Sequence, residues 1–153
     1  MNANCDSAPD TVAHIQRVQY LLEACRLNLV RRGCDHDASK LEEPEKPAFD
    51  ACKEKLASMA YGSPEYKVAL AELGPALQHH YAHNSHHPEH WPNGVDDMSL
   101  FDVIEMLMDW KAATERMKGG GDIRRSLEIN AGRFKLSPQL ASILANTIRE
   151  MGW

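Results

Sequence analysis

Apolar residues recur at intervals of three and four along most of this chain of 153 residues, and this spacing limits its fold more than any other feature. The clearest run comprises Val12, Ile15, Val18, Leu22, Cys25 and Leu29. Such spacing places apolar side chains on one helix face, so we predict an amphipathic helix over residues 10–32 that ends at Gly33. Alternating runs typical of strands are nearly absent. We therefore predict an all-α fold, a compact bundle of about five to seven helices.

Turn and capping residues predict the bounds of the later helices. After a turn or short helix over residues 35–46, we predict a helix over residues 48–59. A helix is then expected from Ser63-Pro64 to about His86, and Gly74-Pro75 can kink or split it. Pro88 disfavours helical geometry at His87, which predicts a loop there. The capping residues Ser99, Asp122 and Ser137 predict helices over residues 100–118, 123–133 and 138–151.

Composition favours an ordinary globular protein, with 43% apolar and 25% charged residues. We predict a disordered tail over residues 1–9 and a single domain over residues 10–153. The absence of a targeting signal and of a long apolar run predicts a cytoplasmic protein that does not enter a membrane. The net charge of −5 argues against duplex nucleic acid as a partner, although a small anionic substrate remains compatible. The apolar faces leave both a monomer and a homodimer open.

Cysteine spacing favours free thiols in a reducing compartment, because no pair has the Cys-x-x-Cys spacing. The four cysteines are Cys5, Cys25, Cys34 and Cys52. Cys34 precedes a histidine by two residues and could add a ligand, but we expect a small buried thiol there.

Histidine is concentrated in one stretch, LQHHYAHNSHHPEHW, which lies between Leu77 and Trp91. Its members are His79, His80, His83, His86, His87 and His90. Spacings of one, three and four stack several imidazoles on one helix flank. Neutral imidazole is the commonest protein metal ligand, so a bound cation would explain the crowding. The alternative is a solvated histidine-rich helix end.

Three acids repeat at helical spacing in the segment after Leu100: Asp102, Glu105 and Asp109. We expect Asp102 to lie on a solvated helix face. For Glu105, a solvated position and a functional role are equally compatible with the sequence. Asp109 stands between Met108 and Trp110, an apolar setting in which an unpaired carboxylate is costly. Asp109 is therefore the acid that we predict as a metal ligand.

The order His14, then His36-Asp37, then Asp109 resembles the HD-domain superfamily of metal-dependent phosphohydrolases. HDASK is similar to the HD-x-x-K form found in its cyclic-dinucleotide phosphodiesterases, in which further histidines bind a second metal. Those histidines are widely separated in the phosphodiesterases, whereas His80 and His86-His87 lie close together here. The resemblance implies a helical HD-like domain that binds one or two ions.

The whole chain more closely resembles a family of uncharacterised domains common in phage genomes, from about His14 to the last helix. That family is marked by HD-x-S-K, an HHPEHW-like block and EML-x-DW. The matching positions are His36, Asp37, Ser39, Lys40, His80, Asn84, His86, His87, Glu105, Asp109 and Trp110. The implied metal ligands are His14, His36, Asp37, His80, His86, His87 and Asp109. For a phage-encoded protein, the cytoplasm would be that of the host.

Mixed histidine and carboxylate ligands favour iron, manganese, zinc, cobalt or nickel over calcium or magnesium. We expect Lys40 to hold phosphate oxygens or to neutralise developing charge, with Arg17 as a second phosphate-binding candidate. Glu105 could orient a ligand or act as an acid or base. Asn84 could tie His80 in place, and His83 could support a ligand or lie at the surface.

The leading hypothesis is a phosphohydrolase that attacks a nucleotide or related small phosphoester with a metal-activated water. One alternative is a di-iron oxygenase on a similar scaffold, which oxygen consumption would reveal. The other is a non-catalytic phage protein that sequesters a nucleotide or binds a host protein. Stoichiometric nucleotide binding without chemical change would favour this last reading.

Overall fold

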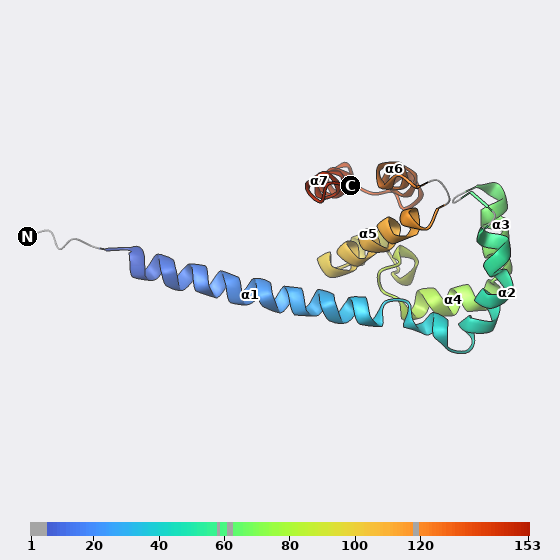
Figure 1. Cartoon of the computed structure of the whole chain (residues 1–153), viewed down its shortest axis with the longest axis horizontal. Helices are drawn as coiled ribbons and strands as arrows, with labels where there is room; N and C mark the ends of the chain where they lie inside the picture. Colours follow the sequence, from blue (N-terminus) through green and yellow to red (C-terminus); the bar gives the residue numbers. More distant parts are fainter. Residues whose placement is uncertain (1–5, 58, 61–62, 118–119) are drawn as a thin grey trace, which may run out of the picture. The chain divides into compact units, whose positions relative to one another are not determined.

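A computed structural model describes residues 6–57, 59–60, 63–117 and 120–153, and the chain divides into two compact units. The first unit ends at His36, and the second runs from Asp37 to Trp153. The described residues form helices and turns without a strand (Figure 1). The predicted all-α class is therefore confirmed. The single domain over residues 10–153 stays a prediction, and residues 1–5 of the expected tail lie outside the described residues.

The first unit consists of one long helix, α1 (Ala8–Asp35), with a proline in its first turn. The predicted end at Gly33 is wrong, because α1 continues for two more residues. A glycine inside a helix costs only about 1 kcal/mol, and the left-handed turn needed for a change of direction comes later, at Asp37 (φ 56°). Cys34 is exposed, which contradicts the expected buried thiol. The free thiols are confirmed for Cys25, Cys34 and Cys52, whereas Cys5 lies outside the described residues.

The second unit begins with a short 3₁₀ helix, η1 (Ala38–Leu41), followed by α2 (Glu45–Ala57), α3 (Pro64–Glu72) and α4 (Gly74–His83). Helix α2 starts three residues before its predicted start, because Pro47 fits in a first turn, where the missing N–H is not needed. The predicted split at Gly74-Pro75 is confirmed, and Gly74 has the positive φ of 43° that glycine tolerates.

Helix α4 ends at His83 rather than at the predicted His86, because Asn84 is extended (φ −123°, ψ 97°). His86 and His87 therefore lie in the turn that follows the helix and not on its last turn. The predicted loop beyond them contains two short 3₁₀ helices, η2 (Pro88–His90) and η3 (Gly94–Asp97).

The last three helices are α5 (Leu100–Glu115), α6 (Ile123–Arg133) and α7 (Pro138–Glu150), each with its predicted cap. The Ser99 Oγ accepts a hydrogen bond from the Asp102 backbone N–H, and the Asp102 carboxylate accepts one from Ser99 N–H, which completes a capping box. Asp102 is buried in this role, so the expected solvated position is wrong. The predicted end of α5 at residue 118 is also wrong, because the helix ends at Glu115.

Buried apolar side chains from α5, α6 and α7 form the main core of the second unit: Val103, Met106, Leu107, Trp110, Ile123, Leu127, Leu144 and Ile148. Helices α2, α3 and α4 pack against one another, and η1 contacts α2 and α4 (Figure 1). In the described part of the chain, no helix has the length and apolar character that a membrane span requires. The side chains considered next come from the start of η1, from α2, from α4 and the turn after it, and from α5.

Candidate metal centre

Asp37, the first residue of the candidate site, has an unusual backbone conformation. Its φ of 56° and ψ of 15° lie in the left-handed region, which aspartate tolerates better than most residues. The Lys40 Nζ lies 2.6 Å from Asp37 Oδ2, and the Lys40 backbone N–H donates to the Asp37 carbonyl at 2.9 Å. These contacts hold the aspartate and direct its other oxygen, Oδ1, toward the histidines.

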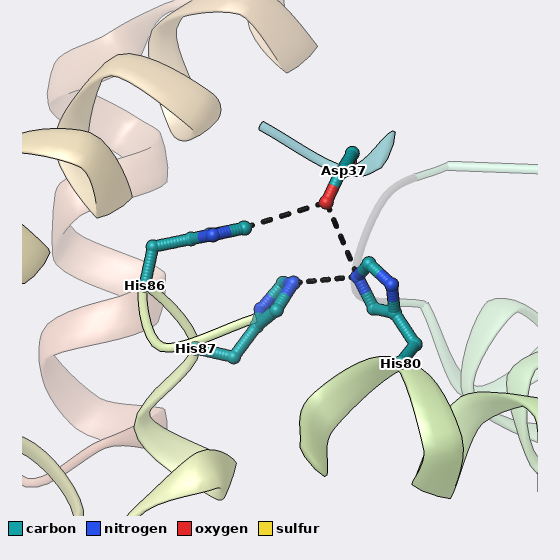
Figure 2. A group of neighbouring side chains, drawn as sticks. All are labelled: Asp37, His80, His86 and His87. Carbon is teal, nitrogen blue, oxygen red and sulfur yellow. Dashed lines mark hydrogen bonds and ion pairs between the residues drawn. The ribbon is translucent and has the colours of Figure 1, made fainter. Parts of the chain in front are cut away.

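Three imidazoles gather around Asp37 (Figure 2). The Nε2 atoms of His80 and His86 lie 3.3 Å and 3.6 Å from Asp37 Oδ1, and His80 Nε2 lies 2.8 Å from His87 Nε2. One ligand atom from each of Asp37, His80, His86 and His87 falls within 4.8 Å of the others. His80 and His86 are both buried. These four side chains, which we call the Asp37 cluster, have the composition and spacing to hold a transition-metal ion.

Glu45, in the first turn of α2, orients one of these histidines from behind. Its carboxylate is fully buried and accepts hydrogen bonds from His79 Nδ1 at 2.7 Å and His80 Nδ1 at 2.9 Å. With its proton on Nδ1, neutral His80 keeps the Nε2 lone pair toward Asp37. Metal-binding histidines commonly donate their other N–H to a carboxylate in this way. Glu45 was not predicted as a site residue, because a glutamate in the charged run EEPEK is typical of a solvated turn.

Glu105, on α5, makes the equivalent contact with a second histidine. Its Oε1 lies 3.0 Å from His86 Nδ1, and the other ring nitrogen of His86, Nε2, is turned toward Asp37. The predicted role of Glu105 in orienting a ligand agrees with this contact. Two carboxylates from different helices therefore fix two imidazoles of the Asp37 cluster.

Asn84 and Ser39 connect the end of α4 to η1. The Asn84 amide donates hydrogen bonds to the His80 carbonyl and to Ser39 Oγ, each at 2.8 Å. Asn84 is buried, so both contacts are shielded from water. The expectation that Asn84 ties His80 in place agrees with this geometry, whereas the part played by Ser39 was not predicted.

Burial keeps two of the clustered imidazoles, His80 and His87, neutral. The pKa of His87 is lowered to about 3, mainly by burial and, to a smaller extent, by electrostatic repulsion from the neighbouring His86 and His80. Burial and the Lys40 charge also lower the pKa of His80, against the opposing effect of Asp37 and Glu45. Burial opposes ionisation of Glu45, but hydrogen bonds from His79, Ser39 and His80 outweigh it and leave the pKa of Glu45 below its ordinary value. Both histidines are therefore deprotonated at neutral pH, as metal ligands must be.

The remaining predicted residues lie in several places. An oxygen of Asp109, on α5, lies within 4.8 Å of an Asp37 oxygen. His83 is exposed, and its Nδ1 donates to the His79 carbonyl. His14 and Arg17 belong to α1, and His36 caps the end of that helix. The ligand roles of His14 and His36 and the phosphate role of Arg17 stay predictions.

A cavity of about 610 Å³ opens beside the Asp37 cluster. Its wall includes His80, His87, Asp109 and Lys40, together with aromatic side chains from α2, α3, α4 and α5. This volume falls in the range of small-molecule sites, which are mostly apolar with a few polar groups. A ligand in the cavity would thus reach the cluster directly.

Comparison with known proteins gives one match. The chain matches the family model described as "Family of unknown function (DUF5662)" over residues 4–150. No curated protein matches the chain, and no solved structure does. Because the match spans nearly the whole sequence, the chain belongs to the DUF5662 family.

Proposed function

We propose that this protein is a metal-dependent phosphohydrolase that acts on a nucleotide or related small phosphoester. The observation that carries the proposal is the Asp37 cluster at the wall of a ligand-sized cavity. The resemblance of His36-Asp37 and Lys40 to the HD-x-x-K motif points to the same reaction class. The histidine and carboxylate donors favour iron, manganese, zinc, cobalt or nickel, as one ion or two.

Asp37, His80, His86 and His87 would hold the metal, with Asp109 as a further candidate. A divalent cation held by these residues would lower the pKa of a coordinated water toward neutrality, which would supply a nucleophile at neutral pH. Glu45 and Glu105 keep the imidazole nitrogens of His80 and His86 aimed at the cluster. Their contribution is to preserve this geometry while substrate enters and product leaves.

Lys40 is suited to phosphate binding. Its ammonium group contacts Asp37 Oδ2 at 2.6 Å and also lines the cavity. An ammonium has three donors, so Lys40 can keep the aspartate contact and still donate to a phosphoryl oxygen. A fixed positive charge at that position would stabilise the negative charge that develops on the phosphoryl group.

The proposal is tested with purified protein loaded separately with manganese, cobalt, nickel, zinc or iron. Each form is incubated with a nucleotide library, and phosphate release is measured alongside metal content by elemental analysis. We expect phosphate release from at least one nucleotide and its loss after chelation. Fully loaded protein that releases no phosphate from any nucleotide would overturn the proposal, and oxygen consumption by the iron form would favour an oxygenase instead.

Asp37→Ala provides the matched test of the ligands, with His90→Gln as the control. His90 lies outside the cluster, and its Nδ1 donates to the Tyr81 carbonyl. We expect Asp37→Ala to lose most of its metal and at least about 100-fold in activity, because it removes the residue on which the imidazoles converge. His90→Gln should retain both. Equal metal content in the two variants would contradict the ligand assignment.

A further inference from the structure

The cavity beside the Asp37 cluster extends well beyond it. Its wall includes four residues that follow one face of α5 and continue into the first two residues after the helix: Asp109, Ala113, Arg116 and Met117. Arg116 keeps right-handed helical geometry (φ −81°, ψ −10°). At 1.5 Å per residue, Arg116 lies about 10 Å beyond Asp109 along the helix axis. The cavity therefore has one end at the cluster and another at Arg116.

The section of wall between these ends is apolar and aromatic. The rings of Trp110 and Phe134 stack with centroids 6.1 Å apart and planes inclined by 5°, and both residues line the cavity. Ile129, on α6, lines the same cavity. Flat aromatic and aliphatic groups in a cavity wall suit a planar ring of a ligand better than a bare inorganic anion.

The far end carries two arginines whose charges are available to a ligand. Arg116 and Arg125 both line the cavity, and neither forms an ion pair with another described residue. Arg133 differs, because its Nη2 contacts Glu89 Oε1 at 2.6 Å. Asp122, three residues before Arg125, also lines the cavity, but its Oδ1 accepts a hydrogen bond from the Arg124 backbone N–H at the start of α6. Guanidinium groups bind phosphate and carboxylate through paired hydrogen bonds.

We propose that Arg116 and Arg125 form a second anion-binding subsite. The substrate of the proposed phosphohydrolase, on which this inference rests, is then a ring-containing phosphoester with a second phosphate or carboxylate at the end opposite the bond that is cleaved. A nucleoside 3′,5′-bisphosphate has this chemistry, because its two phosphates lie on opposite sides of the sugar and its base is a planar ring. The base packs along the Trp110 section of the wall, the reacting phosphate reaches the cluster, and the other phosphate meets the arginines.

The test compares adenosine 3′,5′-bisphosphate with adenosine 5′-monophosphate by calorimetric titration of manganese-loaded protein. We expect the wild-type protein to bind the bisphosphate at least about tenfold more tightly, as one additional charge-assisted contact allows. In Arg116→Ala or Arg125→Ala, this preference should fall toward unity while the affinity for the monophosphate stays within about twofold. Arg149→Ala, an exposed arginine on α7, should leave both affinities unchanged.

Three results would overturn the second subsite. The wild-type protein could bind the bisphosphate and the monophosphate equally tightly, or its preference for the bisphosphate could survive in both arginine variants. The third result is an equal loss of affinity for both nucleotides in those variants. Circular dichroism melts of each variant establish that the fold is intact. A preference that depends on the arginines, in protein that releases no phosphate, would support the subsite while overturning the proposed hydrolysis.

Discussion

Glu45 is the residue on which the geometry of the candidate site most depends. A fully buried carboxylate is costly unless its charge is met by hydrogen bonds, and His79 and His80 supply two. In return, the carboxylate fixes which nitrogen of His80 faces Asp37. Glu45 therefore determines the orientation of a ligand without belonging to the Asp37 cluster.

We predict that Glu45→Gln weakens metal binding by about 10- to 100-fold, because a neutral amide holds the His80 Nδ1–H less strongly than a carboxylate does. Competition against a chromophoric chelator measures the affinity. Glu43→Gln, an exposed carboxylate in the same segment, is the matched control and should bind metal as the wild type does. Unchanged affinity in Glu45→Gln would mean that the carboxylate does not orient His80.

Residue patterns predicted the imidazoles but not the groups that hold them. His80, His86 and His87 stand out in the sequence because histidine is rare and six occur together. Glu45 does not, because the contact that buries it comes from α4, far along the chain. The same reason explains why the burial of Asp102 was not predicted: Ser85, 17 residues earlier, donates a hydrogen bond to its carboxylate at 2.6 Å.

At the scale of elements, α5 joins the core to the site. One side of the helix carries Met106 and Leu107, which are almost completely buried, and an adjacent flank carries Glu105 and Asp109. Burial of such side chains contributes about 1.5–3 kcal/mol each and fixes the helix in position. The stability of α5 therefore controls where Glu105 meets His86.

We predict that Ser99→Ala lowers the free energy of unfolding by about 1–2 kcal/mol, because it removes the cap of α5 and a donor to the buried Asp102. Urea unfolding followed by tryptophan fluorescence measures the change. Ser142→Ala, which removes an exposed hydroxyl that donates to a carbonyl in α7, should change stability by less than about 0.5 kcal/mol. Equal effects of the two substitutions would argue against a capping role for Ser99.

The starts of α5, α6 and α7 were predictable from the sequence, whereas the start of α2 and several helix ends were not. Ser99, Asp122 and Ser137 act on the backbone two or three residues ahead, so a short sequence pattern contains the whole interaction. The ends of α1 and α4 depend on the backbone conformations of His36 (φ −53°, ψ 124°) and Asn84 (φ −123°, ψ 97°), where the chain leaves helical geometry. Local signals such as Gly33 therefore gave the wrong end.

At the scale of the whole molecule, the neutral buried imidazoles make folding depend on pH. The pKa of His80 and that of His87 are lower in the folded protein than the ordinary value near 6.5. Below about pH 6.5 the unfolded chain thus binds protons that the folded chain does not. This difference favours the unfolded state as the pH falls.

We predict that metal-free protein loses stability progressively from about pH 6.5 downward, with the contribution of His87 continuing to about pH 3. The lowered pKa of Glu45 acts in the same direction below its ordinary value. Urea midpoints measured at a series of pH values give the slope. His87→Gln should have a shallower slope than the wild type, whereas His90→Gln should retain the wild-type slope. A midpoint independent of pH would contradict the neutral state of the buried histidines.

We also predict that metal stabilises the folded protein, because only the folded chain brings the cluster together. Free metal at 100 times its dissociation constant should add about 2.7 kcal/mol, and a chelator should remove it. Thermal melts at several manganese concentrations measure the change in Tm. Asp37→Ala should show little dependence on the metal, and a Tm that rises equally in this variant would indicate binding elsewhere.

The left-handed backbone of Asp37 has an evolutionary and engineering consequence. One residue both changes the direction of the main chain and supplies the carboxylate on which three imidazoles converge. Most side chains are disfavoured at this φ, and the residues that tolerate it best are glycine, asparagine and aspartate. Of these three, aspartate alone offers an anionic ligand. A redesign of the centre could therefore exchange its histidines one at a time, but this position leaves almost no choice of residue.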